Sequence, residues 1–294
     1  MLVFDLWIEA ALAGLFGLLI GSFLNVVIYR FPKMLEQQWA AECAEYTSNT
    51  GSVAAVEVKV AATEVFNLSQ PRSRCTFCGH TVRWFENIPV LSYLFLRGRC
   101  SACQAPISLR YPLVELLTAG LFFFCVHRWG ITPTGLAWCL FCATLVALAF
   151  IDWDTTLLPD DLTLPLLWAG LLASALQWTN VPLFGAVVGA ASGYLSLWLV
   201  YWAFKLATGK EGMGYGDFKL FAALGAWFGW QALVPLTLLA SVVGAVVGIA
   251  MKFASSLREG GYVPFGPFLA GAGFIALIWG PQTVLEAILK ALGL

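Results

Sequence analysis

Residues 162–204 form a run of 43 amino acids without one charged side chain, and this feature constrains the fold more than any other. A helix needs about 20 residues to cross the hydrocarbon core of a bilayer, so the run has room for two crossings. Charged residues make up only 11% of the chain, against about 25% in a typical soluble domain. The mean hydropathy is +0.81. We therefore expect an all-α polytopic membrane protein, with the lipid bilayer as its surroundings.

The overall charge excludes one class of partner. The chain has 16 lysines and arginines against 17 aspartates and glutamates, which gives a formal net charge of -1. A protein that binds nucleic acid through its phosphates carries an excess of positive charge. We therefore expect no nucleic-acid partner.

Uncharged runs of helix length predict about eight transmembrane helices. The 43-residue run is broken at Thr179-Asn180-Val181-Pro182, which indicates two helices joined by a turn. Residues 220–251 are too long for one upright crossing, so we expect two short helices that reverse at Gly229-Trp230-Gln231. The other spans are expected at residues 10–29, 111–129, 130–151 and 260–285.

Three glycines in the fifth predicted span indicate close helix packing. Gly185, Gly189 and Gly193 recur every four residues and therefore lie on one face of a helix. Because these positions have no side chain, another helix can approach them closely. We expect a packing surface there.

The distribution of positive charge orients the chain in the membrane. If the segment between the first two spans is cytoplasmic, 14 lysines and arginines lie on that side, against Arg128 and Lys290 outside. We therefore expect a first transmembrane helix in residues 1–30, a cytoplasmic segment at 31–112 and a transmembrane part at 113–294. Residues 36–70 have the composition of a soluble insert without clear periodicity.

Four cysteines in the cytoplasmic segment have the spacing of a metal site. Cys75 and Cys78 form one Cys-x-x-Cys knuckle, Cys100 and Cys103 form a second, and 21 residues separate the two. Together they supply the four thiolates of a tetrahedral Zn²⁺ site, which has no open position and is therefore structural. A pair of disulfides is the alternative, but a reducing cytoplasm disfavours it. His80 is expected to stand outside the ligand set.

Aspartates at the cytoplasmic ends of predicted spans are candidates for catalysis. An ionisable side chain beside an apolar span is costly, and it indicates function unless it caps a helix. Capping explains Asp160 or Asp161, which follow a proline at a predicted helix start. It does not explain Asp152, which ends a span where the helix dipole disfavours a carboxylate. Asp217 could be a cap, but the three glycines just before it favour the close approach of a ligand.

Two carboxyls from different helices can hydrolyse a peptide without a metal or a covalent intermediate. One acts as general base on a water molecule and the other acts as general acid. A helix favours negative charge at its N-terminal end and disfavours it at its C-terminal end. We therefore expect Asp217 to be the base and Asp152 the acid of an aspartyl protease.

Several motifs occur along the chain in an order that resembles one family. Besides the two knuckles and Asp152, they are Gly21-Ser22-Phe23-Leu24-Asn25-Val26-Val27-Ile28-Tyr29-Arg30, Glu86-Asn87-Ile88-Pro89, Arg110-Tyr111-Pro112-Leu113-Val114-Glu115, Leu157-Leu158-Pro159-Asp160 and Gly214-Tyr215-Gly216-Asp217-Phe218-Lys219. From about residue 14 to 280 the chain resembles the type IV prepilin leader peptidase family. Gln104 departs slightly from that pattern, because the second knuckle can carry Gly there.

The resemblance implies a bacterial inner-membrane enzyme with two activities. In residues 113–294, Asp152 and Asp217 would cut the leader from type IV prepilins or type II secretion pseudopilins on the cytoplasmic side. Residues 31–112 would then methylate the new N-terminal residue with S-adenosylmethionine. No Gly-x-Gly-x-x-Gly follows a strand, so we expect no Rossmann cofactor site. The resemblance places the methyl transfer in the cytoplasmic segment, where Glu86, Asn87 and Gly98 beside the knuckles are the candidate cofactor-binding residues, and structural support of the knuckles is their alternative role.

Two other classes of protein remain as alternatives. An ion- or proton-coupled membrane transporter also uses intramembrane acids, but it places them near the midplane on broken helices of an inverted repeat, and no such repeat is visible. A noncatalytic assembly protein would use the knuckles for docking. Both alternatives predict that Asp152→Asn and Asp217→Asn leave prepilin processing unchanged.

Overall fold

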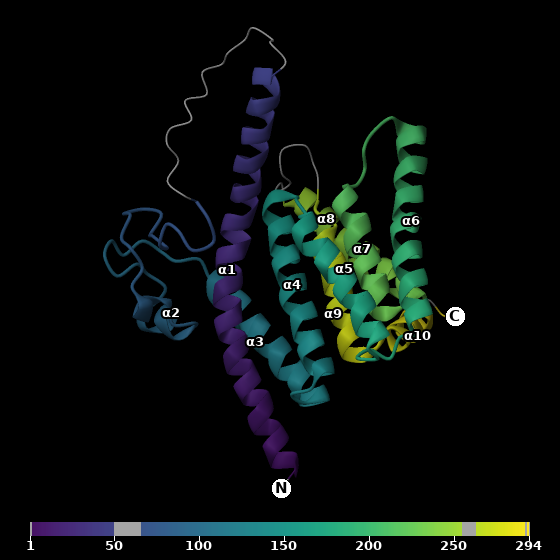
Figure 1. Cartoon of the computed structure of the whole chain (residues 1–294), viewed down its shortest axis with the longest axis horizontal. Coiled ribbons are helices and arrows are strands. Elements are labelled where there is room, and N and C mark those ends of the chain that lie inside the picture. The colour runs from purple at the N-terminus through teal and green to yellow at the C-terminus, as the bar shows by residue number, and fades with distance from the viewer. Residues whose placement is uncertain (1, 50–65, 255–262, 292, 294) are drawn as a thin grey trace. The chain divides into compact units, whose positions relative to one another are not determined.

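The named elements of the protein are all helical (Figure 1). The computed structural model describes residues 2–49, 66–254, 263–291 and 293. Within these ranges the only strand-like pairings are two isolated bridges beside the cysteines. The predicted all-α class is confirmed. Residues 50–65 of the expected soluble insert, and the positively charged Lys59 and Arg258, lie outside the described residues.

The chain divides into two compact units. Residues 11–123 form what we call the N-terminal unit, and residues 1–10 with 124–294 form the C-terminal unit. Helices α1 (Leu2–Asn49) and α3 (Arg110–Trp129) contribute to both. The cysteines lie in the N-terminal unit and the candidate catalytic aspartates lie in the C-terminal unit.

In the N-terminal unit, glycines let α1 pack closely on α3. A Cβ on Gly17 would lie 2.8 Å from Cα of Ala119, and one on Gly21 would lie 2.6 Å from Cα of Glu115, so neither position has room for a side chain. The segment that follows α1 holds the 3-10 helix η1 (Trp84–Asn87) and the short helix α2 (Leu91–Phe95). Beyond its apolar stretch α1 continues to Asn49, because Met, Leu, Glu, Gln and Ala in this part favour helix.

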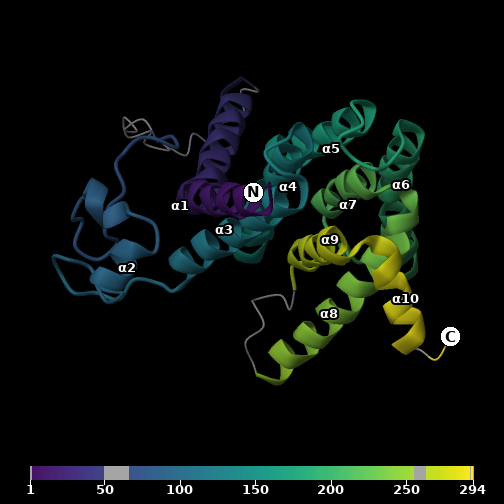
Figure 2. The ribbon, with the colours of Figure 1, turned by 90° about the horizontal axis from the view of Figure 1, so that it is seen from below.

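The C-terminal unit is built around one short helix. Ten of the 14 residues of α7 (Tyr215–Phe228) are buried, and Figure 2 shows this helix in the middle of the unit. The surrounding elements are α4 (Pro133–Thr155), α5 (Asp160–Ala175), α6 (Leu183–Thr208), η2 (Trp230–Ala232), α8 (Leu233–Phe253), α9 (Gly266–Trp279) and α10 (Pro281–Ala291). The expected helix break at residues 179–182 and the expected reversal at Gly229 are both present.

The predicted glycine surface on α6 meets α7. A Cβ on Gly189 would collide with the backbone of Gly225, and one on Gly193 would lie 2.9 Å from the carbonyl oxygen of Phe221. Gly185 differs, because its nearest neighbours are Pro182 and Val181 in the preceding turn. Two of the three glycines therefore serve the close helix contact that their spacing predicts.

The prediction of eight transmembrane helices is not supported. In the described part of the chain, four helical stretches are long and apolar enough to cross a membrane: Asp5–Tyr46, Pro133–Thr155, Leu183–Thr208 and Trp230–Phe253. There are five if α9 and α10, which are bent by 103°, form one span. Helices α5 and α7 have 16 and 14 residues, short of the about 20 that a crossing needs. An apolar run does not distinguish burial inside protein from contact with lipid, and α7 is buried inside protein.

Candidate active site

The two candidate catalytic aspartates are buried in the C-terminal unit. Asp152 lies in the last turn of α4 and is 4% exposed, and Asp217 lies in the first turn of α7 and is 7% exposed. They are close enough for their charges to interact electrostatically. The structure therefore brings together two acids that are far apart in the sequence.

A backbone amide of α9 holds the carboxylate of Asp152. The N–H of Gly266 donates to Oδ2 of Asp152 at 2.9 Å. A Cβ on Gly266 would lie 2.6 Å from the same oxygen, so only glycine permits this approach. Leu158 fills the space next to it, because it contacts both Gly266 and Gly216. Glycines from α7 and α9 thus let their backbones close around this end of α4.

Asp217 is not a helix cap. The residue at the N-cap position of α7 is Gly214, and its backbone N–H donates to the carboxylate of Asp217. Within the described residues, Oδ1 of Asp217 is buried and has no hydrogen-bond partner. A buried polar atom without a partner costs about 1–3 kcal/mol, so this oxygen favours a ligand that can bond to it.

These contacts favour roles opposite to those expected from the helix ends. A hydrogen bond to a charged group contributes about 1.5–3 kcal/mol, whereas a helix end contributes about 0.3–1 kcal/mol. The amide of Gly266 therefore outweighs the dipole of α4 and favours a negative charge on Asp152. Asp217 also accepts from one backbone amide, but its burial and the neighbouring charge of Asp152 raise its pKa and favour the protonated form.

The capping explanation for Asp160 is wrong. Pro159 occupies the N-cap position of α5, and Asp160 and Asp161 are the first two residues of that helix. The carboxylate of Asp160 instead pairs with Nζ of Lys219, at 2.6 and 2.7 Å to its two oxygens. Lys219 follows Asp217 by two residues, so this ion pair ties the start of α7 to the start of α5.

The four cysteines of the knuckles converge in the N-terminal unit. The sulfur atoms of Cys75, Cys78, Cys100 and Cys103 all lie within 4.8 Å of one another. The Sγ atoms of Cys75 and Cys103 are 3.8 Å apart, and those of Cys78 and Cys100 are 4.0 Å apart. A tetrahedral site with Zn–S bonds of about 2.3 Å places its sulfurs about 3.8 Å apart. The cluster therefore fits a metal ion, and the alternative of disulfides is not observed, since all four thiols are free.

Backbone amides favour the thiolate form in each knuckle. The N–H groups of Cys78 and Phe77 lower the pKa of Cys75 to about 6. The N–H groups of Cys103 and Ala102 likewise lower the pKa of Cys100. At Cys103 the amide of Ala105 lowers the pKa, but hydrogen bonds to the other cysteines and burial outweigh it and raise the pKa. A metal ion binds thiolates, so the backbone favours binding through the first sulfur of each knuckle.

The two knuckles are copies of one turn. The N–H of Gly79 donates to the carbonyl of Cys75 at 2.9 Å, and the N–H of Gln104 donates to that of Cys100 at 3.0 Å. The residue after the second cysteine has a positive φ in both, +71° for Gly79 and +60° for Gln104. Gln104 thus adopts a conformation that favours glycine, which explains the glycine expected at this position.

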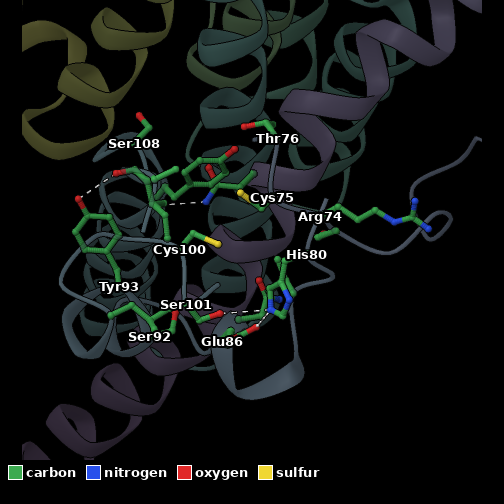
Figure 3. Close-up of a pocket in the computed structure, with 18 of the residues that line it drawn as sticks. Arg74, Cys75, Thr76, His80, Glu86, Ser92, Tyr93, Cys100, Ser101 and Ser108 are labelled. Atoms are coloured by element: carbon green, nitrogen blue, oxygen red, sulfur yellow. Dashed lines mark hydrogen bonds and ion pairs between the residues drawn. The ribbon is translucent and has the colours of Figure 1, made fainter. Parts of the chain in front are cut away.

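A cavity of about 480 Å³ lies beside the cysteines in the N-terminal unit (Figure 3). Of the candidate cofactor-binding residues, Glu86 and Asn87 line it and Gly98 does not. A Cβ on Gly98 would lie 2.7 Å from the hydroxyl oxygen of Tyr93, and φ is +68°. Gly98 therefore shapes the turn behind the wall. The volume is in the range of sites for small molecules.

Hydrogen bonds fix the carboxylate of Glu86. Its Oε2 accepts from the N–H of Arg83 at 2.8 Å and lies 3.2 Å from Nε2 of His80. The Arg83 amide, with the Ser101 hydroxyl, lowers the pKa of Glu86 to about 2. Figure 3 shows His80 beside Glu86 and Ser101. The predicted place of His80 outside the ligand set agrees with this contact.

Two contributors to these sites were not predicted from the sequence. Gly266 stands in Pro264-Phe265-Gly266-Pro267, which indicates a helix start but no contact with Asp152. Glu115 lines the cavity, and in the sequence it is one charge in an apolar span and the last residue of the motif that begins at Arg110. Such a charge is itself a signal of function.

Comparisons with known proteins agree with the division of the chain into an N-terminal and a C-terminal unit. The family described as the bacterial peptidase A24 N-terminal domain matches residues 15–129, and the type IV leader peptidase family matches residues 139–249. The prepilin leader peptidase/N-methyltransferase of Aeromonas salmonicida is 55% identical over 276 residues, 93% of this chain and 92% of the relative. The protein of that name from Pseudomonas putida is 52% identical over 272 residues, which cover 92% of this chain and 91% of the relative. No solved structure matches the chain.

Proposed function

Because the chain belongs to the type IV leader peptidase family, we propose that it cleaves the leader from type IV prepilins or type II secretion pseudopilins and then N-methylates the new N-terminal residue. The observation that carries this proposal is the pair of buried acids, Asp152 and Asp217. A transporter is not favoured, since the relatives bear the name of a peptidase and methyltransferase.

The two acids divide the proton transfers of peptide hydrolysis. The carboxylate of Asp152, held by the amide of Gly266, takes a proton from water, and the oxygen of that water bonds to the carbonyl carbon of the scissile peptide. The protonated carboxyl of Asp217 gives its proton to the carbonyl oxygen. When the tetrahedral intermediate collapses, the leaving nitrogen takes a proton and the carbon–nitrogen bond breaks.

The site faces the cytoplasm in this proposal. Asp152, Asp217 and the ends of α4 and α7 that carry them would lie at the inner surface of a bacterial inner membrane, as the excess of lysine and arginine on that side predicts. A prepilin has an apolar helix just after its basic leader. That helix can stay in the bilayer while the scissile bond reaches the acids at the interface.

The four cysteines would hold a structural Zn²⁺. The spacing of their sulfur atoms fits a closed four-thiolate site. Such a site offers no position to a substrate, so the ion would fix the two knuckles relative to each other. The knuckles carry several residues of the cavity wall, among them Cys75, His80 and Ser101.

The cavity beside the knuckles would bind S-adenosylmethionine, which supplies the methyl group. It has a mixed wall of polar and aromatic side chains, including Asn87, Tyr93 and Tyr111, and its volume suits a ligand of this size. Glu86 and Asn87 would contact the donor, and Gly98 would hold the turn behind it. This site is separate from the paired aspartates in the chain, since the two belong to different units.

Purified protein incubated with a prepilin and S-adenosylmethionine tests the proposal. Mass spectrometry is expected to show loss of the leader and gain of one methyl group. With Asp152→Asn or Asp217→Asn, cleavage is expected to fall by at least about a thousandfold, because each variant lacks one of the two proton-transfer groups. A pilin that is already trimmed serves as the control and should still be methylated by both variants. Unchanged cleavage in either variant would contradict the proposal.

A further inference from the structure

Glu115 is a buried acid in the wall of the cavity beside the knuckles. It lies in the second turn of α3, is 7% exposed and lines the same cavity as Glu86 and Asn87. A buried carboxylate is costly unless it is paired or hydrogen-bonded. It therefore raises the question of which positive group balances its charge.

No cation of the described chain balances it. Oε2 of Glu115 accepts from the N–H of Val90 at 2.8 Å, and the hydroxyl of Ser22 is its second partner. Both partners are neutral. Arg30 is buried near the same cavity, but its guanidinium donates to the carbonyl oxygens of Asn67 and Pro71 instead. The charge of Glu115 is thus left for a cation that enters the cavity.

Apolar side chains next to Glu115 on α1 and α3 are exposed. On α3 its neighbours Leu113 and Leu116 are 53% and 56% exposed, and on α1 Phe23 is 51% exposed. These apolar faces suit contact with lipid. Three residues of the cavity lining, Ser22, Asn25 and Glu115, are therefore polar side chains on an apolar pair of helices.

We infer that Glu115 binds the N-terminal ammonium of the trimmed pilin and removes its proton before methyl transfer. This inference rests on the N-methyltransferase function proposed above. A free α-amine has a pKa of about 7.7–8.0, so at neutral pH it is mostly protonated and has no lone pair to react. A carboxylate that meets this ammonium can both bind the cation and accept its proton, which frees the lone pair for the reaction.

The proton transfer leads to a balanced reaction. Glu115 takes one proton from the ammonium and leaves a neutral amine. The lone pair of the amine forms the new nitrogen–carbon bond to the methyl group of S-adenosylmethionine, while the carbon–sulfur bond breaks and the sulfur keeps its electron pair as a neutral thioether. The product is a methylammonium, and Glu115 returns its proton to water.

The substrate's ammonium suits Glu115 better than the amino group of the methyl donor does. A pilin helix arrives through the bilayer, and Glu115 lies on the apolar helix pair. The methyl donor is water-soluble and arrives from the cytoplasm, and Glu86 and Asn87 of η1 supply other polar groups of the cavity lining. The other titratable groups of the wall are Arg30, Arg74, His80 and Glu86, with three tyrosines and the cysteines Cys75 and Cys100.

Glu115→Gln separates the chemical role from a structural one. The amide oxygen of glutamine still accepts from Val90 and Ser22, so only the charge and the proton acceptor are lost. With a trimmed pilin peptide, the methylation rate at pH 7 is expected to fall by about a hundredfold or more. Cleavage of full-length prepilin by the same preparation should stay within about twofold. Glu42→Gln, an exposed acid on α1, is the matched control and should methylate normally.

Two further measurements make the test decisive. The methylation rate of Glu115→Gln should rise about tenfold from pH 6 to 7 and less steeply as the pH approaches the pKa of the amine, since only the free amine reacts, whereas the wild type should vary less. Binding of S-adenosylhomocysteine by calorimetry should change less than about threefold. A methylation rate within threefold of the wild type, or a tenfold loss of this binding, would overturn the inference.

A folding defect is recognised by a lower melting temperature together with lost cleavage. In that case Glu115→Asp, which keeps the charge, must methylate faster than Glu115→Gln at equal stability, or the inference is wrong. If the wild type itself does not methylate the trimmed peptide, the proposed methyltransferase function fails first.

Discussion

The two units of this protein both bury a carboxyl without a cationic partner among the described residues, but they hold it by different means. In the C-terminal unit, Asp217 lies on a short helix that glycines allow its neighbours to surround. In the N-terminal unit, Glu115 lies in the wall of a cavity whose other wall is shaped by cysteine knuckles. One site depends on helix packing and the other on a loop segment that a metal ion can stabilise. We therefore expect the two activities to be separable by mutation.

The largest effect is expected where α6 and α7 touch. In Gly225→Ala the new methyl group would collide with the backbone of Gly189, which cannot move aside as a side chain can. We expect a loss of about 1–3 kcal/mol or more in the free energy of unfolding, measured by thermal unfolding in detergent. Cleavage should fall with it, while the metal content of the knuckles should stay the same.

Gly271→Ala in α9 is the control for that change. A Cβ there has nothing within 4 Å, so alanine only improves helix propensity and should stabilise the protein by up to about 1 kcal/mol. If both variants lost stability equally, close contact between α6 and α7 would not be what stabilises the C-terminal unit.

The next effect concerns the metal site. Cys100→Ser removes one of four thiolates, so the protein is expected to lose its metal ion, and the rate of methylation should fall by at least about tenfold. Cleavage should remain close to normal because Asp152 and Asp217 belong to the other unit. Metal content by mass spectrometry and the two activities measured on one preparation check this. Cys43→Ser, an exposed cysteine of α1, should change neither. Equal loss of both activities would show that the two units cannot be separated.

The smallest effect is expected at the position after the second cysteine of each knuckle, Gly79 in one and Gln104 in the other. Gln104 has a φ of +60° where Gly79 has +71°, and this conformation costs a residue other than glycine about 1 kcal/mol. Gln104→Gly should therefore strengthen metal retention against a chelator by about fivefold, and Gly79→Gln should weaken it by a similar factor. If both variants changed metal retention in the same direction, the side chains at these positions, and not the backbone conformation, would set how tightly the metal is held.

The helices and the cysteine cluster could be predicted from the sequence because both depend on local patterns. Uncharged runs located α3, α4, α5 and α6, and the two Cys-x-x-Cys pairs predicted the convergence of their sulfur atoms. The number of spans could not be predicted in this way. The same apolar composition serves a helix in lipid and a helix inside protein, so the sequence predicts a span at α7, which is buried in the C-terminal unit.

By itself the sequence determined the candidate site residues: two aspartates at the ends of apolar segments and four cysteines at metal-ligand spacing. Only the tertiary structure decided their surroundings. The amide of Gly266, 114 positions from Asp152, donates to the Asp152 carboxylate, and the packing of α1 on α3 turns Glu115 into part of a cavity wall. The reason is that hydrogen bonds and burial act over a few ångströms in space, and no periodicity along the chain records which distant backbone will supply them.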